Sequence, residues 1–335
     1  MGGAGGLDAS VDAPPDAAAL PLLNAWHIPI NAEPATVTMR NPRFPAAAGT
    51  VYIYVGVQPK GSIIGATLYW WWSGETSPHQ KAFSFDSNQG SNEYWVMAFT
   101  MPPRPVGTFR YYIELQPSDA ASHAVTYLYG TDTSTTKASS PVQAQASPYK
   151  PDVRLPAAGG DAGFAEIVIT EAMINAAGSN ETPKEWFEVY CAASVPVTLD
   201  GCKVGDSNSL VTIAAPELIL WPGVYAVLGA TADSANMGGF VPDHAYGDGL
   251  IAFNNALPGD QLRVLLPDDS VLDQVTYGSN WNAGTYGTDG HSMQLSIALD
   301  SLKNDDPAQW CMSQRTYGLG TSFGTPQAAS DGCAP

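Results

Sequence analysis

Residues 51–72 read VYIYVGVQPKGSIIGATLYWWW, two β-rich runs separated by the turn residues Gln58-Pro59-Lys60-Gly61. Runs of β-branched and aromatic residues bounded by Pro and Gly are typical of strands joined by tight turns. Further runs of this kind stand at 93–99, 108–115 and 124–130. Their spacing of roughly 10 to 20 residues predicts an antiparallel β-sandwich over residues 24–147.

The composition of the chain agrees with an all-β fold. Of its 335 residues 44% are hydrophobic and 14% charged, with 33 Gly and 27 Pro, so the chain can bury a core yet is interrupted too often for long helices. Its length favours two domains. No apolar run reaches the roughly 18 residues of a membrane-spanning helix, so no transmembrane segment is expected.

The charge is unevenly distributed along the chain. Fourteen Lys and Arg oppose 32 Asp and Glu, which gives a net charge of −18. Residues 1–23 carry three acids and no base, residues 24–155 eight acids and nine bases, and residues 156–335 21 acids and five bases. An acidic protein repels nucleic-acid phosphates and anionic lipid, so nucleic acid is not an expected partner. A solvated surface explains the acids, and oxygen-rich Ca²⁺ loops are the alternative.

Composition also divides the chain into segments. Residues 1–23, rich in Gly, Ala, Pro and Asp, predict a disordered tether, and residues 148–163 predict a linker before a second domain at 164–335. Tethers of this kind often follow the lipid-modified Cys of exported bacterial lipoproteins. A lipid anchor upstream of Met1, on an outer-membrane lipoprotein, is therefore one hypothesis.

Six segments of the second half share the order of motifs of a known family. They are AEIVITEAMINAAG (165–178), KEWFEVYCAASVPVTLDGCKVGD (184–206), ILWPGVYAVLGA (219–230), FNNALPGDQLRVLLPDDSVLDQVTYGSNW (253–281), GTDGHSMQLS (287–296) and FGTPQAAS (323–330). Together residues 165–329 resemble a lamin tail domain, which implies an immunoglobulin-like β-sandwich of the type found in nuclear lamins and secreted bacterial proteins. Residues 92–115 resemble fibronectin-III-like modules of exported bacterial proteins. Two immunoglobulin-like sandwiches in tandem are therefore expected.

All four cysteines, Cys191, Cys202, Cys311 and Cys333, lie in the second half. From the residues alone three pairings are open. A Cys₄ zinc site is an alternative, but no C-x₂-C pair occurs. The resemblance places Cys191 and Cys202 at the ends of a short hairpin and lets the tail bring Cys333 to Cys311, which implies disulfides 191–202 and 311–333. An even number of cysteines fits an oxidising compartment.

An aromatic strand stands out in the first half. In Leu68-Tyr69-Trp70-Trp71-Trp72 alternate side chains point to opposite faces, so Tyr69 and Trp71 share one face. An aromatic row on the outer face of a sheet can stack sugar rings, and Trp95 on a neighbouring strand extends the row in this interpretation. The alternative is an outer face covered by a loop or by the other domain.

Motifs for catalysis and for cofactors are weak. The chain contains neither H-E-x-x-H nor a Gly-rich phosphate loop followed by Lys, and its five His are scattered, so a non-enzyme without cofactor is expected. Five residues are weak Ca²⁺ candidates, although they match no EF-hand loop. They are Asp206, Asn208, Asp233, Asp243 and Asp248.

These features predict a non-catalytic, exported or cell-surface bacterial protein for binding or adhesion, with a protein or glycan as partner. A carbohydrate-binding accessory protein that uses Tyr69, Trp71 and Trp95 is the first alternative. A secreted hydrolase with a dispersed site is the second. The sequence indicates neither a particular ligand nor an oligomeric state.

Overall fold

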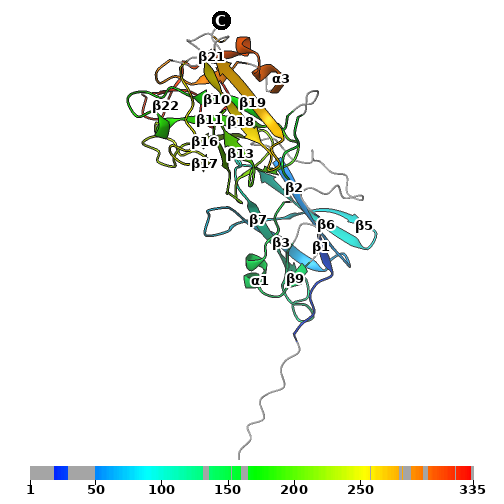
Figure 1. The fold of residues 1–335 in the computed structure, drawn as a ribbon. Helices are drawn as coiled ribbons and strands as arrows, with labels where there is room; N and C mark the ends of the chain where they lie inside the picture. Colours follow the sequence, from blue (N-terminus) through cyan, green and yellow to red (C-terminus); the bar gives the residue numbers. More distant parts are fainter. Residues whose placement is uncertain are drawn as a thin grey trace, which may run out of the picture.

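The computed structural model of the protein describes residues 19–28, 50–130, 136–151, 153–159, 165–256, 258–278, 281, 288–296, 301–320 and 322–332. Within them the chain is nearly all β, which confirms the predicted all-β class. Residues 1–18 of the predicted tether lie outside the described residues. Every helix among the described residues is too short or too polar to span a bilayer. Figure 1 shows the first half (blue to green) and the second half (green to red) stacked end to end.

Two sheets face each other in the first half. One has the order β1 (Ala25–Ile28), β2 (Thr50–Val57), β6 (Asn92–Thr100), β5 (Ser84–Gln89). The other has the order β4 (His79–Ala82), β3 (Ile63–Trp72), β7 (Phe109–Pro117), β8 (Thr126–Tyr129), β9 (Thr136–Ala138). The five predicted strand runs correspond to β2, β3, β6, β7 and β8. Apolar side chains from both sheets form one core, among them Ile53, Val55, Leu68, Met97 and Ile113. The first half is therefore an antiparallel β-sandwich.

The alternation along β3 fixes what each face of its sheet presents. Leu68 and Trp70 belong to the core between the sheets, whereas Tyr69 and Trp71 belong to a separate cluster on the outer face. Helix α1 (Pro141–Ala146) begins after Ser140, whose Oγ accepts a hydrogen bond from Val142 N at 3.3 Å. The buried Ala144 of α1 packs on the same outer face.

The second half contains two larger sheets and two small two-stranded sheets. The six-stranded sheet has the order β17 (His244–Ala245), β16 (Tyr225–Gly229), β11 (Trp186–Cys191), β10 (Ile167–Met173), β20 (Met293–Leu295), β21 (Trp310–Met312). The four-stranded sheet has the order β14 (Leu210–Thr212), β13 (Lys203–Gly205), β18 (Gly259–Leu265), β19 (Val271–Gly278). The small sheets pair β12 (Val197–Thr198) with β15 (Ile219–Leu220) and β22 (Thr316–Tyr317) with β23 (Ser322–Phe323). Short helical turns are η1 (Thr182–Lys184), α3 (Ser301–Asn304) and η2 (Pro307–Gln309).

The core of the second half joins its two larger sheets. Buried residues of β10 and β11, such as Ile169 and Phe187, cluster with Val204, Leu262 and Val275 of the four-stranded sheet. Strands β16 and β17 pair in parallel, and the remaining pairs of these sheets are antiparallel. Two sheets packed through one apolar core make this half a second sandwich-like unit.

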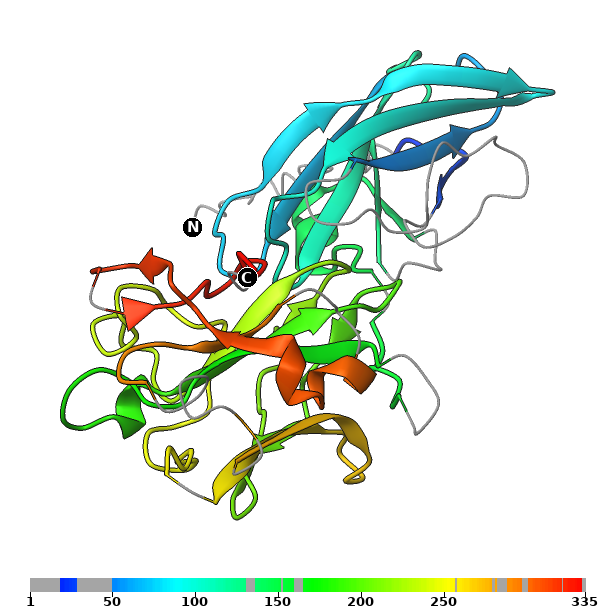
Figure 2. The same ribbon diagram turned by 90° about the horizontal axis from the view of Figure 1, so that it is seen from above.

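The two halves lie against each other (Figures 1 and 2). Residues of the second half take part in the core of the first. Trp221 comes from the second half but is buried in the core of the first, with its ring centroid 5.6 Å from that of Trp72. Its Nε1 donates to the carbonyl of Gly107 at 3.2 Å, and Gly107 N donates to Ile219 O at 2.9 Å. Gly107 has φ +107°, a left-handed conformation that favours glycine.

Charged pairs surround this junction. The Arg104 guanidinium is paired with Asp243, and Arg110 is paired with Glu217 at 2.6 Å. In both pairs the base belongs to the first half and the acid to the second. A shared apolar core with charge pairs at its edge makes the junction rigid, unlike a contact between domains on a flexible linker.

The predicted linker is partly built into both halves. Tyr149 is fully buried in the first core, and its backbone pairs with Tyr111. Arg154 forms a bridge with Val197, and its guanidinium binds both oxygens of Glu166 at 2.6 Å. The described part of residues 148–163 is thus held by packing and hydrogen bonds. The Pro, Ala and Gly content of this segment did not indicate such contacts.

Candidate ligand-binding surfaces

Five aromatic residues form what we call the outer aromatic cluster on the five-stranded sheet. They are Tyr69, Trp71, Tyr112, Tyr127 and Tyr129. Tyr69 of β3 stands opposite Tyr112 of β7, and their rings stack with centroids 4.8 Å apart and an interplanar angle of 12°. Trp71 meets the Tyr112 ring edge-on at 6.3 Å. Period-2 alternation on two neighbouring strands therefore gathers these rings on one face.

Helix α1 covers only one side of this cluster. Tyr112 and Tyr127 are 4% and 8% exposed and pack with Ala144, whereas Tyr69 and Trp71 are half-buried. The open side of the cluster consequently presents parts of two aromatic rings to solvent. Rings held by stacking lose little conformational freedom when a ligand binds.

Polar groups border the exposed rings. The Glu114 carboxylate accepts a hydrogen bond from Gln116 Nε2 at 2.7 Å and is hydrogen-bonded to the hydroxyls of Tyr69 and Tyr127. Burial raises the pKa of Tyr112 to about 12, with smaller contributions from Tyr69 and Glu114. Burial and Glu114 also raise the pKa of Tyr127, so its hydroxyl stays protonated at neutral pH and donates to Glu114.

Trp95 does not extend the row as the sequence predicted. It lies on β6 of the opposite sheet, packs at the edge of the core between the sheets and meets the Phe85 ring at 6.3 Å. Its Nε1 donates to Glu93 Oε1 at 2.5 Å. Tyr94 and Val96 of β6 point outward, and they do so on the far side of the sandwich. The structure therefore brings Tyr69 and Trp71 together and separates Trp95 from them.

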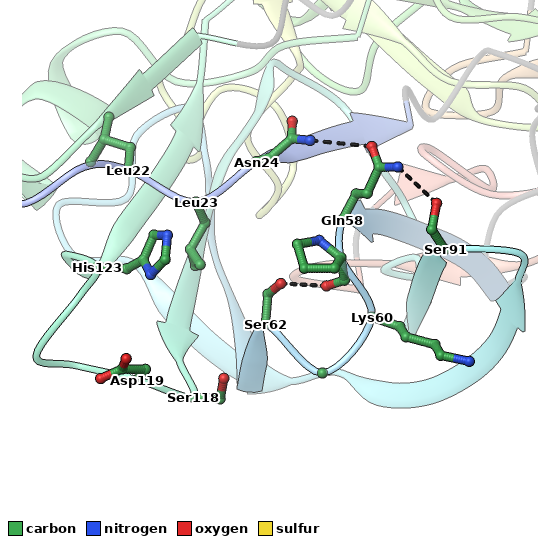
Figure 3. A pocket seen from close by; sticks show the side chains of 12 residues that line it. Leu22, Leu23, Asn24, Gln58, Lys60, Ser62, Ser91, Ser118, Asp119 and His123 are labelled. Atoms are coloured by element: carbon green, nitrogen blue, oxygen red, sulfur yellow. Dashed lines mark hydrogen bonds between the residues drawn. The ribbon is translucent and has the colours of Figure 1, made fainter.

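A second surface feature is an open pocket at one end of the first half, with a volume of about 650 Å³ (Figure 3). We call it the end pocket. It is formed by the residues just before β1, the β2–β3 turn, the β5–β6 turn and the β7–β8 loop, so no local motif indicated it. Its polar lining includes Asn24, Gln58, Lys60, Ser91, Asp119 and His123.

The Ca²⁺ candidates are dispersed and satisfied by the protein itself. Asp206 caps its own turn by accepting a hydrogen bond from Asn208 N at 2.6 Å, and Asp233 accepts from Ala235 N at 3.0 Å. Asp243 is paired with Arg104, and Asp248 is exposed. Within the described ranges no three His, Cys, Asp or Glu side chains gather as metal ligands do. Asp206 and Asp233 thus satisfy backbone amides of their own turns, and the Ca²⁺ hypothesis stays a prediction.

The predicted Cys191–Cys202 disulfide is also wrong, since both residues are free thiols. Cys191 ends β11 of the six-stranded sheet, whereas Cys202 precedes β13 of the four-stranded sheet. Residues 192–201 thus cross from one sheet to the other and do not form the short hairpin that the resemblance implied. Cys311 is disulfide-bonded, and its predicted partner Cys333 lies outside the described residues.

The two free thiols should be unreactive in the native protein and reactive after unfolding without reductant. Both are fully buried, and burial raises the pKa of Cys191 to about 12 and that of Cys202 to about 11. Thiolate is the reactive form, so alkylation at pH 8 should be negligible until the core opens. Iodoacetamide labelling followed by peptide mass mapping checks this. If both peptides stay unlabelled in denaturant, the two residues form a disulfide after all.

Two neighbouring carboxyls with raised pKa values lie away from any surface. Glu171 of β10 and Glu188 of β11 are direct cross-strand partners, and each is 1% exposed. Glu171 accepts hydrogen bonds from Ser292 Oγ at 2.5 Å and from Thr325 N at 2.7 Å. Glu188 accepts from Gln327 N at 2.6 Å. Burial is the main cause that raises the pKa of Glu171 to about 7 and also raises that of Glu188. Sealed from solvent, the pair holds the C-terminal segment and is not open to a substrate.

A G-x-S-x-G pattern occurs at residues 320–324. In hydrolases this pattern places a Ser on a sharp turn between a strand and a helix. Here Ser322 belongs to β23 of a two-stranded hairpin, and its hydroxyl is hydrogen-bonded to Tyr317. The surrounding structure therefore differs from that of a nucleophile elbow.

Comparisons with known proteins identify no family. No protein-family model and no curated protein matches the chain. Among solved structures, a cyclomaltodextrinase aligns over 32% of this chain and 17% of its own, with 11% identity and a TM-score of 0.25. A cycloalternan-forming enzyme from Listeria monocytogenes, solved with a pentasaccharide substrate, aligns over 82% of this chain and 23% of its own, with 10% identity and a TM-score of 0.27. The chain thus spans less than a quarter of either neighbour, and likenesses this weak support no argument about fold family or function.

Proposed function

We propose that the protein is a non-catalytic glycan-binding protein, and that the outer aromatic cluster is its binding surface. The observation that supports this is the half-exposed pair Tyr69 and Trp71, held by Tyr112 and bordered by hydrogen-bonding groups. Sugar rings have an apolar face of C–H groups and a rim of hydroxyls. An aromatic platform with polar neighbours complements both features.

The neighbours of the platform have suitable chemistry. Glu114 and Gln116 on β7 supply acceptors and donors on the same face as Tyr112. Arg110 stands opposite Trp71 across the β3–β7 pair and is held in place by Glu217. A sugar that stacks on Trp71 therefore lies within reach of side chains already fixed by other contacts, which lowers the entropic cost of binding.

Replacing Trp71 tests the proposal. In affinity gel electrophoresis with soluble xylan, β-glucan, starch and mannan, the wild-type protein should be retarded by at least one polysaccharide. Trp71→Ala should weaken that binding about tenfold or more, because a central aromatic contact commonly carries more than 1 kcal/mol of binding free energy.

Phe85→Ala is the matched control, because Phe85 is a 52% exposed aromatic residue on the opposite sheet. It should bind as the wild type does. Equal weakening by both substitutions, or no retardation of the wild type by any of the polysaccharides, would count decisively against the outer aromatic cluster as a glycan site.

The proposal extends to fold family and location. We place residues 165–329 with lamin-tail-like immunoglobulin domains and the first half with fibronectin-III-like modules, and we assign the protein to the bacterial cell surface or exterior. The disulfide at Cys311 supports an oxidising compartment. Expression with the native upstream sequence and protease accessibility on whole cells test the location. Protection from protease in intact cells would oppose it.

A further inference from the structure

We propose that the end pocket is a second ligand site, and that it takes a short neutral oligosaccharide. The proposal rests on the proposed function for the class of ligand but not for the place of binding. The register of β3 and β7 separates the two places: Trp72 pairs with Phe109 beside the second half, whereas Ile63 pairs with Pro117 at the pocket end. The end pocket therefore faces away from the junction.

Its size suits a small molecule and not a single ion. A volume of about 650 Å³ falls within the roughly 300 to 1,000 Å³ of small-molecule sites. Leu22, Leu23 and Pro59 give it an apolar part, and Figure 3 shows His123 beside the two leucines. Such a surface accommodates the C–H face of a sugar ring.

A chain of amides and hydroxyls forms the polar side of the pocket (Figure 3). Asn24 Nδ2 donates to Gln58 Oε1 at 3.3 Å, and Gln58 Nε2 donates to Ser91 Oγ at 2.7 Å. Because the amides donate in this order, the side-chain oxygen Oδ1 of Asn24 remains as an acceptor. The hydroxyl hydrogen of Ser91 remains as a donor. An acceptor and a donor held apart by one fixed amide match the hydroxyls of a sugar, each of which both donates and accepts.

The charges of the pocket balance, which favours a neutral ligand. The Lys60 ammonium has no acceptor among the described residues, in contrast to Lys81, Arg104, Arg110 and Lys137 of the same half. Asp119 contributes a carboxylate whose pKa is lowered by hydrogen bonds from Ser122 and Ala121. One cation and one anion leave no net attraction for a charged ligand, and the protein's charge of −18 repels polyanions.

The test uses the full chain and isothermal titration calorimetry with maltotriose, cellotriose and xylotriose as separate probes. At least one should bind. Asn24→Ala and Ser91→Ala change exposed residues, and each should weaken that binding about fivefold, which is the usual effect of one lost hydrogen bond. Binding should change less than about twofold between 0.05 and 0.5 M NaCl, because no ion pair with the ligand is involved.

Two controls separate this proposal from the outer aromatic cluster. Asn88→Ala removes an exposed amide of the same half outside the pocket and should leave trisaccharide binding unchanged. If Trp71→Ala abolishes trisaccharide binding and Asn24→Ala does not, the end pocket is overturned while the proposed function stands. If no trisaccharide binds but Trp71-dependent retardation by polysaccharide persists, the end pocket is likewise overturned.

Discussion

Trp221→Ala should lower the free energy of unfolding by about 3 to 5 kcal/mol and split a single unfolding transition into two. The substitution removes a fully buried ring from the first core, where Trp221 packs against Trp72 and Phe109. It also removes the Nε1 hydrogen bond to Gly107 O. Because Trp221 belongs to the second half, its loss weakens both the first core and the coupling between the halves.

Urea unfolding followed by circular dichroism, together with calorimetry, measures both effects. Trp310→Ala is the matched control, because Trp310 is 5% exposed and belongs to the second core alone. It should lower the free energy of unfolding without splitting the transition, because the core shared through Trp221 stays intact. A single transition for Trp221→Ala with a loss below about 1 kcal/mol would show that the halves do not share a core.

The second large effect concerns pH: Glu171→Gln should remove about 3 kcal/mol of pH dependence from the stability of the protein. Burial raises the pKa of Glu171 from its ordinary value of 4.5 to about 7. Between these values the native protein keeps a proton that the unfolded chain releases. Glu171 therefore contributes stability that is fully present below pH 4.5 and is lost as the pH rises to about 7.

Other buried groups act in the same window. Burial raises the pKa of Asp273 to about 7 and that of Glu185 to about 8, so stability should fall overall from pH 5 to pH 8. His27 acts in the opposite direction, because burial lowers its pKa to about 3. Its contribution is complete above pH 6.5 and is lost as the pH falls towards 3.

Unfolding free energies of wild type and Glu171→Gln at half-unit steps from pH 5 to pH 8 measure the effect. The amide keeps the shape of the carboxyl and can still bond Ser292 and Thr325, so the variant should fold. Asp248→Asn, an exposed acid of the same half, is the control and should retain the wild-type slope. Identical slopes for all three proteins would rule out a buried, protonated Glu171.

Much of the fold was predictable because it depends on local pattern. The runs at 51–57 and 66–72 alternate or are continuously apolar, and the turn residues between them end each strand, so β2 and β3 could be located. Strand β5, SFDSNQ, has no such apolar pattern because nearly all of it is exposed or half-buried at a sheet edge, and it was missed.

The candidate sites depend on pairing between distant segments. Alternation placed Tyr69 and Trp71 on one face, but which β7 residues lie opposite them is set by register, so Tyr112 and Glu114 were missed. Trp95 was assigned to the wrong face. Alternation along a strand separates its two faces, but it does not indicate which of them packs against the other sheet. The end pocket depends on turns that are far apart in sequence.

The end-to-end arrangement of the two halves also separates charge along the molecule. Residues 1–155 carry 11 acids and nine bases, a net charge of −2, whereas residues 156–335 carry −16. With the halves joined rigidly end to end, this difference forms a dipole along the long axis (Figure 1). Near a negatively charged surface at low ionic strength, such a dipole turns the second half away and directs the end pocket towards the surface.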